Sequence, residues 1–163
     1  MLALQIGRAP RSPWRTAVRC GFGHPSVIAS PSRLEDGTPF PTLMWLTCPW
    51  LVEHVGEAES AGATTKWAQR ASTEPELADA LTAADAAVRV LRAGESGGDD
   101  ACAGTGIAGQ RDPLGVKCLH AHVALVLAGV ADPIGGAVLG QVEPECPDDR
   151  CGALIAAARG GPA

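Results

Sequence analysis

The chain has 163 residues, 46% of them apolar, which is enough for one domain with a hydrophobic core, expected over residues 1–163. The net charge of -5 argues against a general nucleic-acid-binding protein. No apolar run approaches the ~18 residues of a membrane span, so membrane insertion is not expected.

The beginning of the chain bears on the cellular compartment. Residues 1–8 are too few for the apolar core of a signal peptide, and no basic segment precedes them. We therefore expect a cytoplasmic protein, in which thiols stay reduced. The six cysteines then indicate metal ligands, reactive groups or core residues before they indicate disulfides.

Residues 1–15 are predicted to form an arm. They contain prolines and the arginines Arg8, Arg11 and Arg15, and Arg19 continues the basic series. A solvated arm is the first interpretation, because runs of charge usually face water. Contact of this basic arm with an acidic protein partner is the alternative.

Three short strands are predicted in the first third of the chain, over residues 17–20, 27–30 and 42–47. A glycine-rich turn at residues 20–25 and a proline-rich loop around Asp36 separate them. Because these links are short, the strands should pair antiparallel.

About four helices are predicted to pack on this sheet, which gives an α+β fold. They are expected over residues 47–62, 73–94, 112–128 and 132–140. Thr73 and Glu76 fit a capping box for the second helix, and Asp-Pro pairs at residues 112 and 132 fit the starts of the last two.

The second helix carries an apolar stripe from Leu77 to Leu91, whose steps of three and four residues are typical of packing on one helix face. Core packing is the first interpretation, and a protein partner that docks on residues 73–94 is the alternative. Residues 95–109 are small and polar and are predicted to form a flexible loop. The G-x-G-x-x-G spacing at residues 104–109 follows no strand, and we attribute it to chance.

The chemically suggestive residues are cysteines and histidines at element ends or in loops. Thiolate-rich sets favour zinc or an iron–sulfur cluster over hard cations. No C-x-x-C pair occurs, and buried cysteines often only pack. The candidate metal ligands are Cys20, Cys48, Cys118, His120, Cys146 and Cys151.

The local sequence supports several of these candidates. Glycines after Cys20 allow backbone N–H groups to point at a thiolate, and the helix start at Cys48 is expected to lower the pKa of its thiol. Cys102, in the glycine-rich loop, is left out of the set. His122 shares a helix face with Cys118, where ligation and buried packing are equally plausible readings.

A second hypothesis is a thiol-dependent enzyme. Cys118 or Cys48 would be the nucleophile and His120 its base. Both cysteines lie near expected helix starts, but no motif of a known cysteine enzyme surrounds them.

Three motifs, at residues 36–43, 45–49 and 116–122, resemble an uncharacterised bacterial family, number 501 among the domains of unknown function. Residues 5–11 resemble its actinobacterial branch. The resemblance covers residue 5 to about 151 and implies a small cytoplasmic protein.

The resemblance also bears on ligands and partners. The family's characteristic thiols correspond to Cys20, Cys48, Cys118 and one of Cys146 and Cys151. Some members have histidine at the position of Cys48, an exchange that zinc tolerates better than an iron–sulfur cluster does, so zinc is the favoured cofactor. Family genes often lie beside those of enolase and a septum-formation initiator, which suggests a further alternative, a non-catalytic adaptor for cell-division or envelope machinery.

Overall fold

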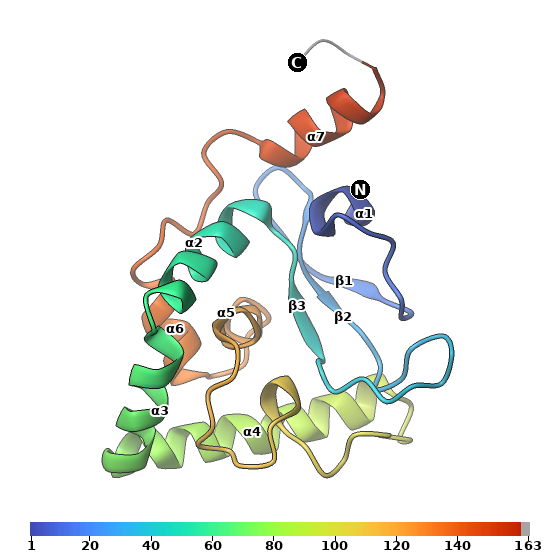
Figure 1. The fold of residues 1–163 in the computed structure, drawn as a ribbon. Helices are drawn as coiled ribbons and strands as arrows, with labels where there is room; N and C mark the ends of the chain where they lie inside the picture. The colour runs from blue at the N-terminus through green and yellow to red at the C-terminus, as the bar shows by residue number, and fades with distance from the viewer. Residues whose placement is uncertain (161–163) are drawn as a thin grey trace.

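The computed structural model describes residues 1–160 and has the expected α+β architecture (Figure 1). The strands are β1 (Arg15–Arg19), β2 (Pro25–Ala29) and β3 (Met44–Leu46). The α-helices are α1 (Leu2–Ile6), α2 (Pro49–Ser60), α3 (Ala63–Thr73), α4 (Pro75–Glu95), α5 (Leu119–Leu127), α6 (Pro133–Leu139) and α7 (Arg150–Ala158), with a 3-10 turn η1 at Ile107–Gly109.

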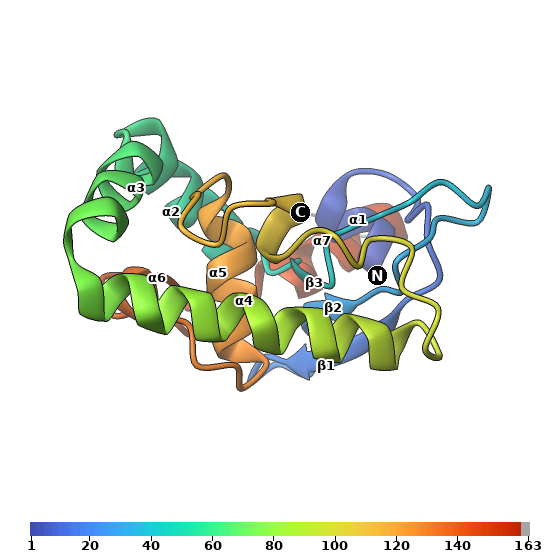
Figure 2. The same ribbon diagram turned by 90° about the horizontal axis from the view of Figure 1, so that it is seen from below.

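The three strands form one antiparallel sheet in the order β1-β2-β3, as predicted. All of β2 is buried, and Val27 lies opposite Leu46 of β3. The apolar helix α5 packs on β3 and on α6. Helix α4 runs along the lower edge of the molecule in Figure 1 and therefore crosses the front of the view from below in Figure 2. The core therefore lies between the sheet, α5 and the helices around it.

The described residues form seven α-helices, and the prediction of α2 and α6 is confirmed. The Asp132 side chain caps α6 by accepting a hydrogen bond from Gly135 N at 2.7 Å. The capping box at Thr73 was wrong, because Thr73 ends α3 and bonds back to Gln69 O at 3.1 Å. The predicted start of the third helix at residue 112 was also wrong. The Asp112 side chain accepts a hydrogen bond from Leu114 N within a turn, and α5 begins only at Leu119.

The apolar stripe of α4 packs mainly into the core. Leu81, Ala84 and Val88 are buried, and Leu91 is 44% exposed. Most of the stripe is therefore already covered within the chain. No helix among the described residues is long and apolar enough to cross a membrane.

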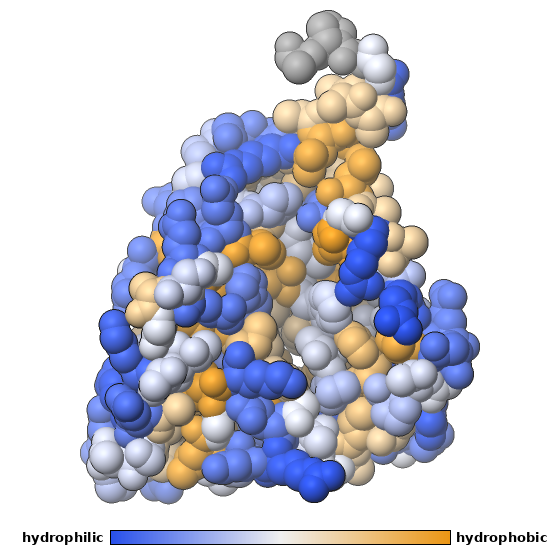
Figure 3. Space-filling model, in the orientation of Figure 1, coloured by the Kyte–Doolittle hydropathy of each residue, from blue (hydrophilic) through white to orange (hydrophobic). Residues whose placement is uncertain are grey.

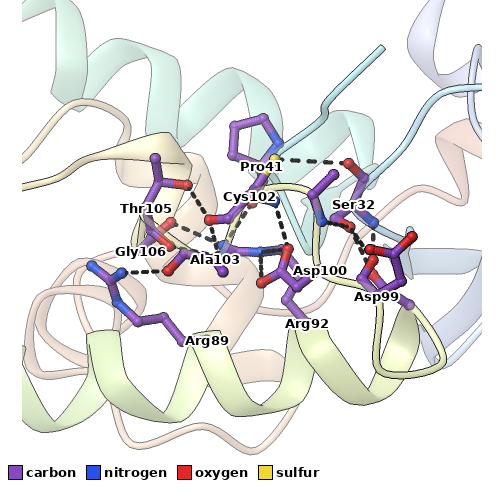
Figure 4. A network of polar contacts seen from close by, with 12 residues as sticks. Ser32, Pro41, Arg89, Arg92, Asp99, Asp100, Cys102, Ala103, Thr105 and Gly106 are labelled. Carbon is purple, nitrogen blue, oxygen red and sulfur yellow. Dashed lines mark hydrogen bonds and ion pairs between the residues drawn. The ribbon is translucent and has the colours of Figure 1, made fainter. Parts of the chain in front are cut away.

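Arg92 of α4 is fully buried and organises residues 96–110 (Figure 4). Its Nε donates to the Asp100 carboxylate at 3.0 Å, and its terminal nitrogens donate to the carbonyls of Thr105, Cys102, Pro41 and Gly106. A guanidinium group has five donors in a fixed plane, so one side chain can hold several turns of this segment together.

The contact between α5 and α6 requires a residue without a side chain at position 135. A Cβ at Gly135 would lie 2.1 Å from the carbonyl oxygen of His122, whereas a Cβ at Gly136 meets nothing within 4 Å. We expect Gly135→Ala to lower the free energy of unfolding by at least about 2 kcal/mol, because backbone must move to relieve the clash. Gly136→Ala should raise it by up to about 1 kcal/mol through helix propensity. Urea denaturation of both variants checks this, and equal stability of the two would contradict the packing described.

Candidate metal centre

Two of the predicted ligands meet at the beginning of α5. Cys118 is the N-cap residue of α5, and His120 lies in its first turn. The Cys118 Sγ and His120 Nδ1 atoms are 3.8 Å apart. This short separation follows from local chain geometry, because the two residues are only two positions apart.

Glu59, near the end of α2, completes the group. Its Oε1 lies 3.2 Å from His120 Nδ1 and also accepts a hydrogen bond from Leu119 N, which holds the carboxylate at the start of α5. Ligand atoms of Glu59, Cys118 and His120 all lie within 4.8 Å of one another. Among the described residues, no other set of three or more such donors meets that distance. The group could hold a metal ion.

The hydrogen bonds of His120 fix which ring nitrogen is available. Its Nε2 lies 3.0 Å from the carbonyl oxygen of Val52, which can only accept, so Nε2 carries a hydrogen. In the neutral ring Nδ1 then has its lone pair free, directed towards Cys118 and Glu59. Histidine ligands of metals characteristically donate their second N–H to a carbonyl or carboxylate in this way.

The surroundings favour a proton on His120 when no cation is present. The pKa of His120 is raised to about 9, mainly by the hydrogen bond with Cys118. Partial burial opposes this rise, whereas the hydrogen bond to Val52 O and the negative charge of Glu59 add to it. A positive charge is therefore favoured at this point, either as imidazolium or as a bound cation.

The group opens onto a cavity of about 460 Å³. Cys118 and His120 line it together with Lys117 and apolar side chains that include Met44, Trp45 and Val52. The surface is hollowed in the middle of the face shown in Figure 3, between the α2 side and the α1 side.

Two residues of the cavity lining each carry a buried polar atom without a partner. The Trp45 Nε1 and Gln5 Oε1 atoms are buried without a hydrogen-bond partner among the described residues, and both side chains line the cavity. A small number of polar groups in an apolar hollow is the usual composition of a small-molecule site.

The other predicted ligands do not join this group in the described part of the chain. Cys20 follows β1, Cys48 caps α2, Cys146 lies in the loop before α7, and Cys151 lies in its first turn. The expected lowering of the pKa of Cys48 was wrong. Burial raises the pKa of the Cys48 thiol, and the nearby thiols of Cys146 and Cys20 raise it further. Hydrogen bonds from the backbone N–H groups of Leu51 and Trp50 lower this pKa, but by less than burial raises it.

Two further residues have structural contacts. His122 is buried, and its Nδ1 lies 2.7 Å from Asp132 Oδ2, so it links α5 to the cap of α6. Cys102, left out of the ligand set, is buried with its Sγ 3.7 Å from Ser32 O.

The fold and the site define a small α+β protein with a candidate Glu/Cys/His metal centre beside a cavity. Comparison with family models matches residues 16–140 to the family described as protein of unknown function (DUF501), and the chain belongs to this family. Searches of curated proteins and of solved structures found no match. Glu59, Cys118 and His120 all lie within the matched residues, while Cys146 and Cys151 lie beyond them.

Proposed function

We propose that the protein binds one zinc ion through Glu59 Oε1, Cys118 Sγ and His120 Nδ1, with a fourth coordination position directed to the cavity. The observation that carries this proposal is the approach of these three donors to within 4.8 Å of one another. One thiolate, one imidazole and one carboxylate make a mixed set that suits zinc, whereas an iron–sulfur cluster prefers thiolates.

The number of ligands bears on the kind of zinc site. Structural zinc sites are closed by four protein ligands, while catalytic sites have three and keep one position for water or substrate. Three protein donors at the edge of a cavity support the second type. In such a site zinc supplies Lewis-acid polarisation of the group at the fourth position.

The protein's own side chains around that position suggest the kind of ligand. The apolar lining of Met44, Leu46 and Ala121 would cover a small organic molecule, and Lys117 at the rim would attract an anionic group. A small, partly apolar molecule with an oxygen or sulfur donor for zinc fits these features.

The proposal is tested with cobalt, which replaces zinc and absorbs visible light. Metal-free protein is titrated with Co²⁺, and the thiolate-to-cobalt band is recorded for the wild type, for Cys118→Ser and for Cys102→Ser as a matched control. We expect Cys118→Ser alone to lose the band that forms at this site. An unchanged spectrum in Cys118→Ser would refute the proposal.

Zinc affinity should rise with pH. The raised pKa of His120, about 9 against an ordinary 6.5, means that a proton competes with zinc for Nδ1 throughout the neutral range. Below this pKa the proton is bound, so each pH unit of acidification should weaken binding about tenfold through this residue. Competition titrations with a chromophoric chelator between about pH 6.5 and 9 check the slope. An affinity that does not change over this interval would contradict the role of Nδ1.

A second candidate function is nucleophilic catalysis by Cys118. The 3.8 Å contact with His120 and the adjoining cavity favour it, and they select Cys118 over Cys48 as the cysteine paired with the histidine. Iodoacetamide labelling separates the two functions. Rapid labelling of Cys118 that saturating zinc abolishes supports the metal site, whereas rapid labelling that zinc leaves unchanged supports the nucleophile.

A further inference from the structure

A second cavity, of about 280 Å³, adjoins the one beside Cys118 and contains none of the three proposed metal ligands. Ile6 and Trp45 line both cavities and so form a wall that the two share. The other walls of the second cavity come from the segment after α1, from the end of β2 and from the loop between β2 and β3. Its chemistry is therefore set by a part of the chain that the metal centre does not use.

Hydrogen bonds hold the segment after α1 against that loop. Glu35 N donates to Arg11 O at 3.1 Å, and the Ser12 hydroxyl donates to the Ser30 hydroxyl at 3.2 Å. Both serines are buried and line the cavity. The two segments lie on the right of the molecule in Figure 1. The cavity walls are thus fixed by contacts within the chain.

The charged side chains of the cavity lining are both arginines. Arg8 and Arg11 line the cavity, and no aspartate or glutamate of the described part of the chain does so. The whole chain has a net charge of -5, so a lining that is only positive departs from the general composition. A guanidinium group presents several N–H donors in one plane, which match the oxygens of a carboxylate or a phosphate.

Arg8 has no acidic partner. The ion pairs within residues 1–160 involve other arginines. The Arg8 Cζ atom lies 5.7 Å from the centroid of the Trp45 ring, a cation–π distance that keeps the guanidinium group beside the cavity. The side chain is exposed, so a ligand from solvent can reach it.

Arg11 has an acidic partner that holds it only weakly. Its terminal nitrogen lies 3.8 Å from Asp36 Oδ2, and the two side chains are 65% and 58% exposed. Exposed pairs contribute little free energy, because water and salt screen them. Asp36 does not line the cavity, so an anion inside it can compete for the Arg11 guanidinium group.

Most of the remaining lining is apolar. Ile28 is buried, and the Phe40 and Trp45 rings are stacked with their centroids 5.4 Å apart. An apolar cavity of about 150 Å³ is enough to hold benzene. The 280 Å³ found here therefore has room for a six-membered ring that carries a charged substituent.

We propose that this cavity binds a small organic oxyanion, a ring compound with a carboxylate or phosphate group. Arg8 and Arg11 bind the charged group, and the ring packs against Phe40 and Trp45. The two kinds of oxyanion share the planar, two-oxygen contact that guanidinium groups recognise. The site needs no metal, so it stands or fails independently of the zinc site at Cys118.

The test is isothermal titration calorimetry of the metal-free chain with benzoate and with phenyl phosphate. Metal-free protein is used so that an anion cannot bind through zinc. We expect saturable binding of at least one of the two in the millimolar range or tighter, as their small size allows. The tighter of the two identifies the preferred oxyanion. Benzyl alcohol, which has the ring without the charge, should show no saturable binding.

Variants locate the bound anion. Arg8→Met and Arg11→Met should each weaken binding about tenfold or more, the usual effect of losing a charge-assisted hydrogen bond. The matched control is Arg111→Met, which removes the same charge from an exposed residue that lines neither cavity. Lys117→Met removes a charge from the cavity beside Cys118. Both controls should keep wild-type affinity, and circular dichroism checks that all variants are folded.

Nuclear magnetic resonance gives a measurement that needs no variant. Ser12, Ser30 and Leu34 line this cavity and not the one beside Cys118, so their amide signals should shift as the anion is added. Absence of saturable binding of both anions, equal binding of benzyl alcohol, or unchanged affinity in both Arg8→Met and Arg11→Met would overturn the proposal. A loss of binding confined to Lys117→Met would do the same, because it would place the anion in the other cavity.

Discussion

Replacing His120 by alanine should weaken zinc binding by at least about 100-fold, since even the loss of an outer hydrogen-bond partner of a ligand costs 10–100-fold. His120 contributes the one imidazole of the proposed site, and Glu59 and Cys118 alone leave two coordination positions to solvent. Competition with a chromophoric chelator measures the change.

The matched control is His54→Ala. His54 lies in α2 with its Nδ1 2.8 Å from Trp50 O and belongs to no described donor set, so its removal should leave zinc affinity within about threefold of the wild type. A similar loss in both variants would point to a general effect on folding. Wild-type affinity in His120→Ala would show that zinc is bound elsewhere.

Replacing Arg92 by methionine should lower the free energy of unfolding by about 3–5 kcal/mol, the cost of removing one member of a buried ion pair. The change removes the guanidinium donors of the Asp100 carboxylate and of four backbone carbonyls. Asp100 and the carbonyls of Cys102 and Gly106 keep other donors, whereas those of Pro41 and Thr105 have none besides Arg92 among the described residues. Segment 96–110 would lose the side chain around which it folds. Urea denaturation gives the magnitude, and Arg70→Met, in an exposed pair with Glu74, is the control expected to change stability far less.

The same pair should contribute to stability in a pH-dependent way. Burial of Asp100 tends to raise its pKa, but hydrogen bonds from Arg92 and Cys102 N and the Arg92 charge lower it overall, below the ordinary 3.8. A lowered folded-state pKa gives stability that is present above 3.8 and lost as the pH falls through the folded value. Arg92→Met should remove this part of the acid transition, and an identical acid profile in both proteins would contradict the pairing.

Much of the fold could be predicted because its signals are local. Asp132 followed by Pro133 marks the start of α6, and the short links between strands indicate antiparallel pairing. Helix α3 was missed because its exposed faces carry mostly polar residues, with Ala71 its one buried side chain. The start of α5 was misplaced because Asp112 can cap a turn as well as a helix.

The candidate site could be predicted only in part. Cys118 and His120 were identified because they lie two residues apart in a recognisable motif. Glu59 was missed, since a glutamate near a helix end normally faces water and nothing in the sequence connects it with a residue 60 positions later. The burial of Arg92 was not predicted either, because it depends on how the loop that follows α4 packs.

The most direct test of the proposed zinc site is elemental analysis of anaerobically purified protein together with Cys118→Ser. We predict about one zinc per wild-type chain and its loss in the variant, which should otherwise remain folded. Absence of zinc from the wild type even after incubation with the metal, or equal zinc in both proteins, would contradict the assignment of Glu59, Cys118 and His120 as its ligands.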